Sequence, residues 1–262
     1  MDNIREPAVA GTFYPADPQE LQSMLQTYLS EAGDGGPLPR AMIVPHAGYI
    51  YSGPVAASGY VRLQQAAGHI DRVILLGPAH RVGFRGIAAS SADGFRTPLG
   101  IVPVDSAAVS EILALPQVHI NDEAHRLEHS LEVHLPFLQV TLNDFTLVPL
   151  VVGDASPEDV SEVIGHFWDK PGTMIIVSSD LSHFHDYDTA MQLDRYTSDA
   201  IEHLALEKIG YEHACGRNPV SGLLLHARQH GLTAHTVDLR NSGDTAGPRN
   251  QVVGYGTYVF TG

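Results

Sequence analysis

The stretch AMIVPHAGYIYSG, residues 41–53, decides the fold that we predict for this chain. Its first four residues, 41–44, are all apolar and predict a strand that is buried on both faces, as in a parallel sheet. Pro45 ends this strand, because proline has no N–H group to donate to a neighbouring strand. His46 follows directly, at the carboxyl end of the strand, where open α/β sheets bind their ligands.

Two further predicted strands end in the same way. The apolar residues 73–76 are followed by His80, and the apolar residues 174–177 are followed by Asp180 and His183. Because ligand sites of open sheets lie at the carboxyl ends of the strands, we expect these side chains to meet the first histidine there. Converging imidazoles are typical of metal binding or of proton transfer.

Strand-like and helix-like segments alternate along the whole chain, and no linker interrupts them. This alternation predicts one α/β domain over residues 1–262, with a largely parallel central sheet, antiparallel edge strands and helices on both faces. Strands are expected at 41–44, 73–76, 87–90, 100–104, 145–152, 174–177, 233–239 and 252–260, with a turn at 95–99 joining the third and fourth. Helices are expected at 17–32, 105–114, 127–139, 156–168, 188–206 and 220–230.

Composition excludes several classes of protein. The net charge of −15 argues against a general surface for nucleic acid or for anionic membranes. The single cysteine, Cys215, excludes an intrachain disulfide and favours a reducing compartment. The start, residues 1–6, does not resemble a signal peptide, and no apolar run approaches the roughly 20 residues of a membrane span. We therefore expect a cytoplasmic protein that binds neither nucleic acid nor membrane.

The histidines at the strand ends are the strongest candidates for metal ligands, above all His46 and His80. The competing interpretation is that both hold loops in place by hydrogen bonds. Asp180 stands three residues before His183, from where it can orient the imidazole and raise its basicity. Alternatively, Asp180 is an ordinary helix N-cap.

A dense group of ionisable residues lies within the predicted helix 127–139. The group consists of Glu128, His129, Glu132 and His134. His129 and Glu132 are three residues apart and therefore share a helix face, whereas His134 points well away from His129. The competing interpretation of the group is a solvated helix face, above all for His134.

The third metal ligand is sought in the loop 240–250, where Asp244 is the only carboxylate. An anionic oxygen suits iron or manganese, whereas a thiolate favours softer ions such as Cu(I) or zinc. The alternative for Asp244 is a turn aspartate that bonds its own backbone. Cys215 precedes a predicted helix, where a thiol pKa can be lowered, but a buried or incidental thiol is the simpler interpretation.

Several motifs, taken in order, resemble the Memo family, whose bacterial and archaeal branch is called AmmeMemoRadiSam system protein B. The resemblance covers nearly the whole chain. The motifs are AGTFYP at 10–15, PHAGY at 45–49, GPAH at 77–80, EHSLEVHLP at 128–136, SSD at 178–180 with His183, and CGR at 215–217.

This resemblance implies a fold similar to that of the class III extradiol ring-cleaving dioxygenases, which hold non-haem Fe(II) with two histidines and a carboxylate. By resemblance, His46 and His80 match the two metal histidines, and His129 and His183 match an acid–base pair. Animal members of the family carry a cysteine near the third ligand position, where this chain has Gly243-Asp244-Thr245.

The resemblance therefore implies an Fe(II)-dependent, dioxygenase-like oxidoreductase that acts with O₂ on a small molecule such as a catechol, with copper or zinc as the other candidate metals. The alternative function is a metal- or peptide-binding protein without catalysis of its own, in a complex with AMMECR1-like and radical-SAM partners. A zinc hydrolase is a third possibility, and it would need a tightly bound zinc ion and an activated water.

Overall fold

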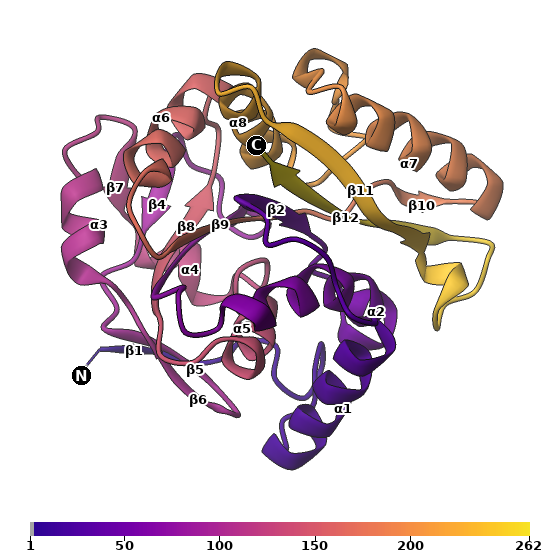
Figure 1. Cartoon of the computed structure of the whole chain (residues 1–262), viewed down its shortest axis with the longest axis horizontal. Helices are drawn as coiled ribbons and strands as arrows, with labels where there is room; N and C mark the ends of the chain where they lie inside the picture. Colours follow the sequence, from indigo (N-terminus) through magenta and orange to yellow (C-terminus); the bar gives the residue numbers. More distant parts are fainter. Residues whose placement is uncertain (1–2) are drawn as a thin grey trace.

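A nine-stranded sheet runs through the protein in a computed structural model that describes residues 3–262 (Figure 1). The strand order is β10-β12-β2-β9-β3-β8-β4-β7, with β11 paired along β12. The strands are β2 (Ala41–Val44), β3 (Arg72–Pro78), β4 (Ile87–Ala89), β7 (Val118–Ile120), β8 (Thr146–Val152), β9 (Thr173–Ser178), β10 (His183–His185), β11 (Thr233–Asn241) and β12 (Val252–Thr261).

The centre of this sheet is parallel, as predicted. Strands β2, β9, β3 and β8 are neighbours and all run in one direction. Antiparallel pairing begins outside them, where β12 pairs with β2 on one side and β4 pairs with β8 on the other. The carboxyl ends of the central strands therefore lie at one edge of the sheet, and the predicted site residues follow those ends.

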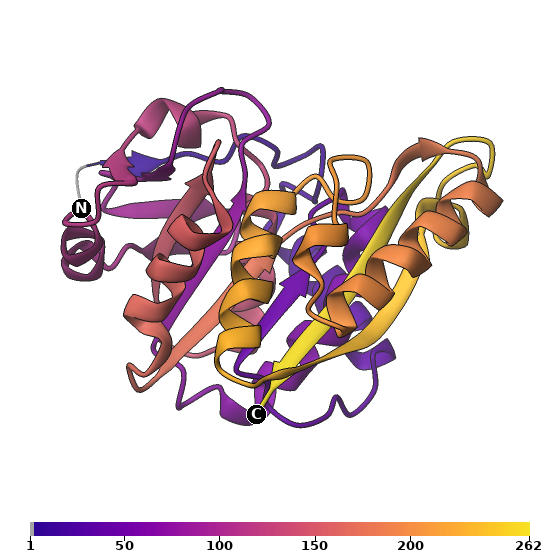
Figure 2. The same ribbon diagram turned by 90° about the horizontal axis from the view of Figure 1, so that it is seen from above.

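Helices cover both faces of the sheet (Figures 1 and 2). On β3, Val73 and Leu75 belong to one apolar core, and Ile74 and Leu76 belong to the other. The first core contains residues of α1 (Pro18–Glu31), α2 (Tyr49–Tyr60) and α5 (Leu135–Thr141). The second contains residues of α3 (Ser106–Ile112), α6 (Pro157–Trp168), α7 (Tyr187–Glu202) and α8 (Arg217–Gln229). This double burial explains why the central strands are apolar without interruption.

The strand pairing that we predicted within residues 87–104 was wrong, because the segments 87–90 and 100–104 do not pair with each other. The hairpin consists of β5 (Gly94–Thr97) and β6 (Gly100–Pro103), which form a separate three-stranded sheet with β1 (Ile4–Arg5). Strand β4 instead joins the main sheet. The turn therefore falls at 98–99, and the residues predicted as a turn at 95–97 are part of a strand.

The predicted helix 127–139 was also wrong over its first half. Helix α4 (Asp122–Arg126) ends before it, and regular helix resumes only at α5, after a single 3₁₀ turn at Glu132–His134. The carboxylate of Glu128 accepts hydrogen bonds from the backbone N–H groups of His129 and Ser130, at 3.0 and 2.9 Å. A side chain that bonds the following backbone in this way competes with helix formation.

Glu132 fixes the N-terminal segment to this interrupted region. Its fully buried carboxylate pairs with Arg5 and accepts hydrogen bonds from the backbone N–H groups of Ala8 and Val9 and from the hydroxyl of Tyr14. Burial, together with the negative charge of Glu132, raises the pKa of the Tyr14 phenol. Glu132 therefore has a structural role, as an anchor for the segment 5–14.

No helix within residues 3–262 combines the length and the apolar character that crossing a membrane requires. The prediction that the chain lacks a signal peptide rests partly on Met1 and Asp2, which lie outside the described residues.

We expect Glu132→Ala to lower the free energy of unfolding by about 3–5 kcal/mol, because it leaves the buried guanidinium of Arg5 without its carboxylate. Urea denaturation measures this change. Glu6→Ala is the matched control, since the Glu6–Arg96 pair is exposed and should contribute about 0–1 kcal/mol. Equal losses in the two variants would contradict the anchoring role of Glu132.

Candidate metal centre

His46 occupies the position that the sequence predicts, directly after β2. Its side chain is 2% exposed, and its backbone N–H donates to Asp180 Oδ1 at 2.7 Å. Asp180 itself follows β9, the parallel neighbour of β2. The two strand ends are thus joined by a hydrogen bond at the edge of the sheet.

The hydroxyl of Ser178 determines which nitrogen of His46 carries the proton. Ser178 donates its one proton to the carbonyl of Ser130 at 2.6 Å, because a carbonyl can only accept. Its oxygen therefore accepts hydrogen bonds from His46 Nδ1 at 2.6 Å and from His134 Nε2 at 2.8 Å. The hydroxyl of Tyr60 donates to His134 Nδ1 at 2.8 Å and completes this series of hydrogen bonds. His46 is consequently protonated at Nδ1, which leaves the lone pair of Nε2 free.

His134 is therefore not on a solvated face. It is 1% exposed, and burial is the main cause that lowers its pKa to about 3. Sequence reasoning missed its role, because the expected helix would have pointed it away from His129.

His80 is held in an analogous way by a carboxylate. Its Nδ1 lies 2.8 Å from Glu128 Oε1, and its backbone N–H donates to Glu128 Oε2 at 2.6 Å. Burial alone would raise the pKa of Glu128, but the hydrogen bonds and the charge of His80 outweigh burial and lower it to about 2. An ionised carboxylate on one imidazole nitrogen orients the ring and leaves the other nitrogen for a metal.

Cys215 is the third member of the group. Its Sγ lies 3.3 Å from His46 Nε2, and its backbone N–H donates to the carbonyl of Asp180 at 3.3 Å. The next residue, Gly216, approaches β9 so closely that a Cβ there would lie 2.5 Å from the carbonyl oxygen of Ser178. Burial, together with the nearby carboxylate of Asp180, raises the pKa of the thiol.

One ligand atom from each of His46, His80 and Cys215 lies within 4.8 Å of the other two. The imidazole planes of the two histidines are 72° apart, so their in-plane lone pairs can meet at one point. Two imidazoles and one thiol are a common donor set for zinc, copper and iron. The group therefore fits a metal ion by its donor chemistry and by its spacing.

A second cluster, which consists of His80, Glu128 and His129, satisfies the same spacing. The rings of His80 and His129 are stacked, with centroids 4.7 Å apart and planes only 19° apart. Imidazole lone pairs lie in the ring plane, so two nearly parallel stacked rings do not direct them at one ion. Glu128 is therefore a partner that orients His80, and the first group is the better metal site.

Asp244 lies apart from this group. Its Oδ1 accepts a hydrogen bond from the hydroxyl of Tyr187 at 2.5 Å, and its Oδ2 accepts one from the backbone N–H of Asn241 at 3.0 Å. The carboxylate thus closes a 3₁₀ turn at Ser242–Asp244. The alternative interpretation, a turn aspartate bonding its own backbone, describes this geometry, and Cys215 rather than Asp244 lies beside the two histidines.

The predicted acid–base residues line a common cavity of about 400 Å³ next to the group. His129, His183 and Asp180 lie on its wall, and Phe13, Tyr51 and Tyr255 add aromatic surface. We call this space the His183 cavity. The structure thus brings together all three residues that the sequence nominated for proton transfer.

Burial perturbs two of these residues. It is the largest cause that lowers the pKa of His129 to about 4, and the Nδ1 atom of this ring has no hydrogen-bond partner among residues 3–262. Burial also raises the pKa of Asp180. Asp180 does not orient His183 directly, because His183 Nδ1 donates to the carbonyl of Leu181 at 2.8 Å.

A β-bulge places His183 on the cavity wall. His183 and His185 pair with the consecutive residues Val253 and Val252, so Phe184 is the extra residue. Its φ of 62° lies in the left-handed region, which is costly for a bulky side chain. Bulges commonly redirect a side chain next to a functional site, and here the redirected side chain is an imidazole.

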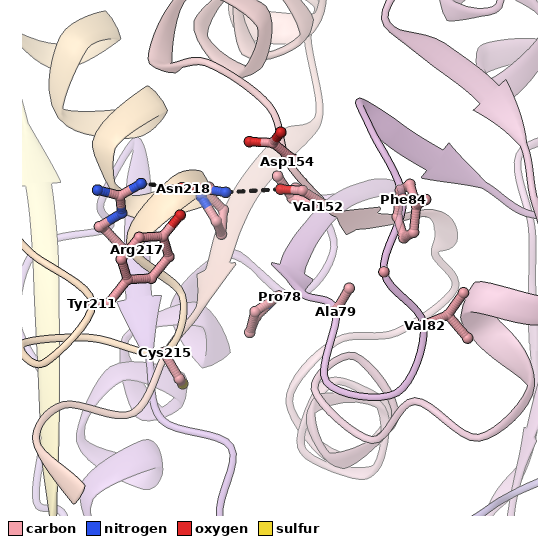
Figure 3. Close-up of a pocket in the computed structure, with 13 residues that line it drawn as sticks. Pro78, Ala79, Val82, Phe84, Val152, Asp154, Tyr211, Cys215, Arg217 and Asn218 are labelled. Carbon is pink, nitrogen blue, oxygen red and sulfur yellow. Dashed lines mark hydrogen bonds between the residues drawn. The ribbon is translucent and has the colours of Figure 1, made fainter.

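A second cavity of about 430 Å³ lies beyond Cys215 (Figure 3). Figure 3 shows Tyr211 and Phe84 on opposite sides of this space, with Pro78 and Ala79 between them and Cys215 below Tyr211. We call it the Tyr211 cavity. The candidate metal centre therefore has Cys215 on the wall of one cavity and neighbouring histidines on the wall of the other.

Comparison with known proteins gives one consistent result. The Memo family, described as Memo-like protein, matches residues 5–259. Among relatives, a MEMO1 family protein of Aquifex aeolicus is 36% identical over 98% of this chain and 99% of its own length. A MEMO1 family protein of Methanosarcina barkeri is 36% identical with the same coverage of both chains.

Among solved structures, an uncharacterized protein of Escherichia coli K12, JW3007, aligns with a TM-score of 0.57 over 84% of this chain and 98% of its own. At 13% identity, this likeness concerns the fold alone.

We expect Ser178→Ala to weaken metal binding by about 10–100-fold, because it releases the imidazole of His46 from its fixed orientation. Competition with a chromophoric chelator measures the affinity. Ser198→Ala is the matched control: it also removes a buried serine hydroxyl, which bonds Tyr258 and not the centre. Unchanged affinity in Ser178→Ala, or an equal loss in both variants, would contradict the role of Ser178.

Proposed function

The chain belongs to the family of Memo-like proteins, and from this premise we propose that it is a metal-dependent oxidoreductase with iron or copper at His46, His80 and Cys215. One observation carries the proposal: two differently oriented imidazoles and a thiol converge beside a cavity that contains further imidazoles.

The thiol changes the expectation about the metal. Two histidines and a carboxylate are typical of non-haem Fe(II), whereas a thiolate increases the preference for softer ions such as Cu(I) and zinc. Because Cys215 rather than Asp244 stands beside the histidines, we place copper on a level with iron. The geometry does not support the set of two histidines and one carboxylate that Asp244 would have completed.

The residues of the chain have separable tasks. Ser178 and Glu128 hold the imidazoles of His46 and His80, so that the ligand set is arranged before a metal arrives. His129 and His183 line the cavity without belonging to the group, and each can exchange a proton with a bound molecule. When bound, the metal would supply a Lewis-acidic centre with positions left for small ligands.

The first test is metal content after anaerobic loading with Fe(II), Cu(I) and Zn(II) in competition. We expect about one ion of iron or copper per chain. We also expect Cys215→Ala to lower the affinity by more than the roughly 100-fold that loss of an outer partner can cost. Asp244→Asn is the control and should bind as the wild type does, since its carboxylate bonds Tyr187 and Asn241.

Two results would overturn parts of this proposal. Loss of metal from Asp244→Asn with retention by Cys215→Ala would reverse the ligand assignment. If the protein binds only zinc and takes up no O₂ with any catechol, the oxidoreductase proposal is wrong. A zinc hydrolase or a metal-binding protein without catalysis would then remain.

We expect His183→Ala to keep its metal and to lose turnover by about 10²–10⁴-fold, the usual contribution of a positioned acid or base. O₂ uptake by the metal-loaded protein measures turnover over a panel of catechols. His185→Ala is the control, because His185 lies on the same strand but not on the cavity wall. Loss of metal from a folded His183→Ala variant would show that His183 is a ligand.

Association with AMMECR1-like and radical-SAM proteins stays a prediction from the family resemblance. Co-purification of the wild type and of a His46→Ala/His80→Ala variant tests it. A complex that survives the double substitution would favour a binding protein without catalysis.

A further inference from the structure

We propose that the Tyr211 cavity is a binding site for a small organic anion, a carboxylate or a phosphate, which is held by the guanidinium of Arg217. The inference goes beyond the proposed metal chemistry, because the cavity and the guanidinium need no metal. The cavity, at about 430 Å³, falls within the size range of small-molecule sites.

Arg217 has hydrogen-bonding capacity that the protein does not use. The Nε atom is buried and has no partner among residues 3–262, and no carboxylate within that range forms an ion pair with the guanidinium. One nitrogen, Nη2, donates to Asn218 Oδ1 at 3.3 Å, a long hydrogen bond. Because Nε is closed to solvent, a ligand in the cavity would meet the terminal nitrogens of the guanidinium instead, and these can donate charge-assisted hydrogen bonds to an anion.

Neighbouring side chains fix the position of the guanidinium. Its Cζ lies 3.8 Å from the ring centroid of Tyr211, and the Asn218 side chain is held by the carbonyl of Gly153 at 2.8 Å. Arg217 is also the first residue of α8, where the helix dipole adds to the positive potential. These contacts therefore hold the guanidinium of Arg217 in one position before a ligand binds.

The other side chains that line the Tyr211 cavity favour a ligand with an aromatic or apolar group. Tyr211 is 72% exposed although it stacks on Arg217, so its other face is free for contact. Phe84 stands on the opposite side, and Pro78 and Ala79 add apolar surface between them (Figure 3). A flat or apolar group fits between these rings, with its charged end at Arg217.

Asp154 is the one acidic side chain on the wall of the Tyr211 cavity, and it does not make the site selective for cations. Asp154 is exposed, so water satisfies its carboxylate, whereas the Nε atom of Arg217 is shielded from water. A cation at Asp154 would gain little, because exposed ion pairs contribute little to binding. The guanidinium of Arg217 is partly buried and has no carboxylate partner among residues 3–262, so it favours an anion.

The test measures binding of benzoate, benzamide and phenyl phosphate to the full metal-free chain by saturation-transfer NMR and calorimetry. Benzamide has the shape of benzoate without its charge. We expect benzoate to bind about tenfold tighter than benzamide, as a charge-assisted hydrogen bond predicts. Tighter binding of phenyl phosphate than of benzoate would assign the site to phosphate, and the reverse would assign it to carboxylate.

Variants locate the binding in this cavity. Arg217→Gln should remove the preference for benzoate over benzamide, and Tyr211→Ala should weaken both probes. Arg228→Gln is the matched control, since Arg228 lies near the other end of α8 and pairs at the surface with Glu207. Equal affinities for benzoate and benzamide, or a preference that persists in Arg217→Gln, would overturn the proposal.

The outcome is independent of the metal centre. The probes are tested without metal, so failure of the oxidoreductase proposal leaves these expectations unchanged. Conversely, metal binding by His46, His80 and Cys215 would stand even if no anion binds near Arg217.

Discussion

The hydroxyl of Ser178 is the contact on which the candidate site depends most. It stands at the end of the central strand β9 and joins His46, His134 and the carbonyl of Ser130. These partners come from two segments that are far apart in the sequence, since Ser130 and His134 belong to the same one. Because the hydroxyl has one proton and gives it to a carbonyl, both imidazoles must donate to it. A single serine thereby sets the protonation pattern of two histidines and leaves the Nε2 lone pair of His46 available at the candidate centre.

The part of the site that follows central strands could be predicted from the sequence. His46, His80 and Asp180 each come directly after an apolar run, and the sheet topology brings such positions to one edge. Periodicity and burial determine those positions, so a single sequence carries the information. His183 was predicted too, although its place on the cavity wall depends on a bulge at Phe184 that no periodicity predicts.

The residue that lies beside the two histidines could not be predicted in the same way, because Cys215 and Asp244 both lie in connecting segments. Cys215 reaches the centre through backbone hydrogen bonds to Asp180 and through the close approach of Gly216 to β9. Asp244 follows a strand as well, but its carboxylate is used by the turn that contains it. The glycine directly after Cys215 was the available signal, since it permits the loop to touch the end of a strand. Loop position is a tertiary property, and the sequence around each candidate was equally compatible with a ligand.

The segment 128–134 shows how a helix-like pattern can serve a site without forming a helix. Its ionisable residues do not share one face: Glu132 turns to the N-terminal segment, Glu128 to His80 and His134 to Ser178. The backbone that a helix would have satisfied is instead bonded partly by the carboxylate of Glu128. On a regular helix the carboxylates of Glu128 and Glu132, four residues apart, would repel each other or remain solvated. The interrupted backbone distributes the ionisable residues among separate partners, and this distribution places an anchor, an orienting carboxylate, a cavity imidazole and a buried imidazole around one centre.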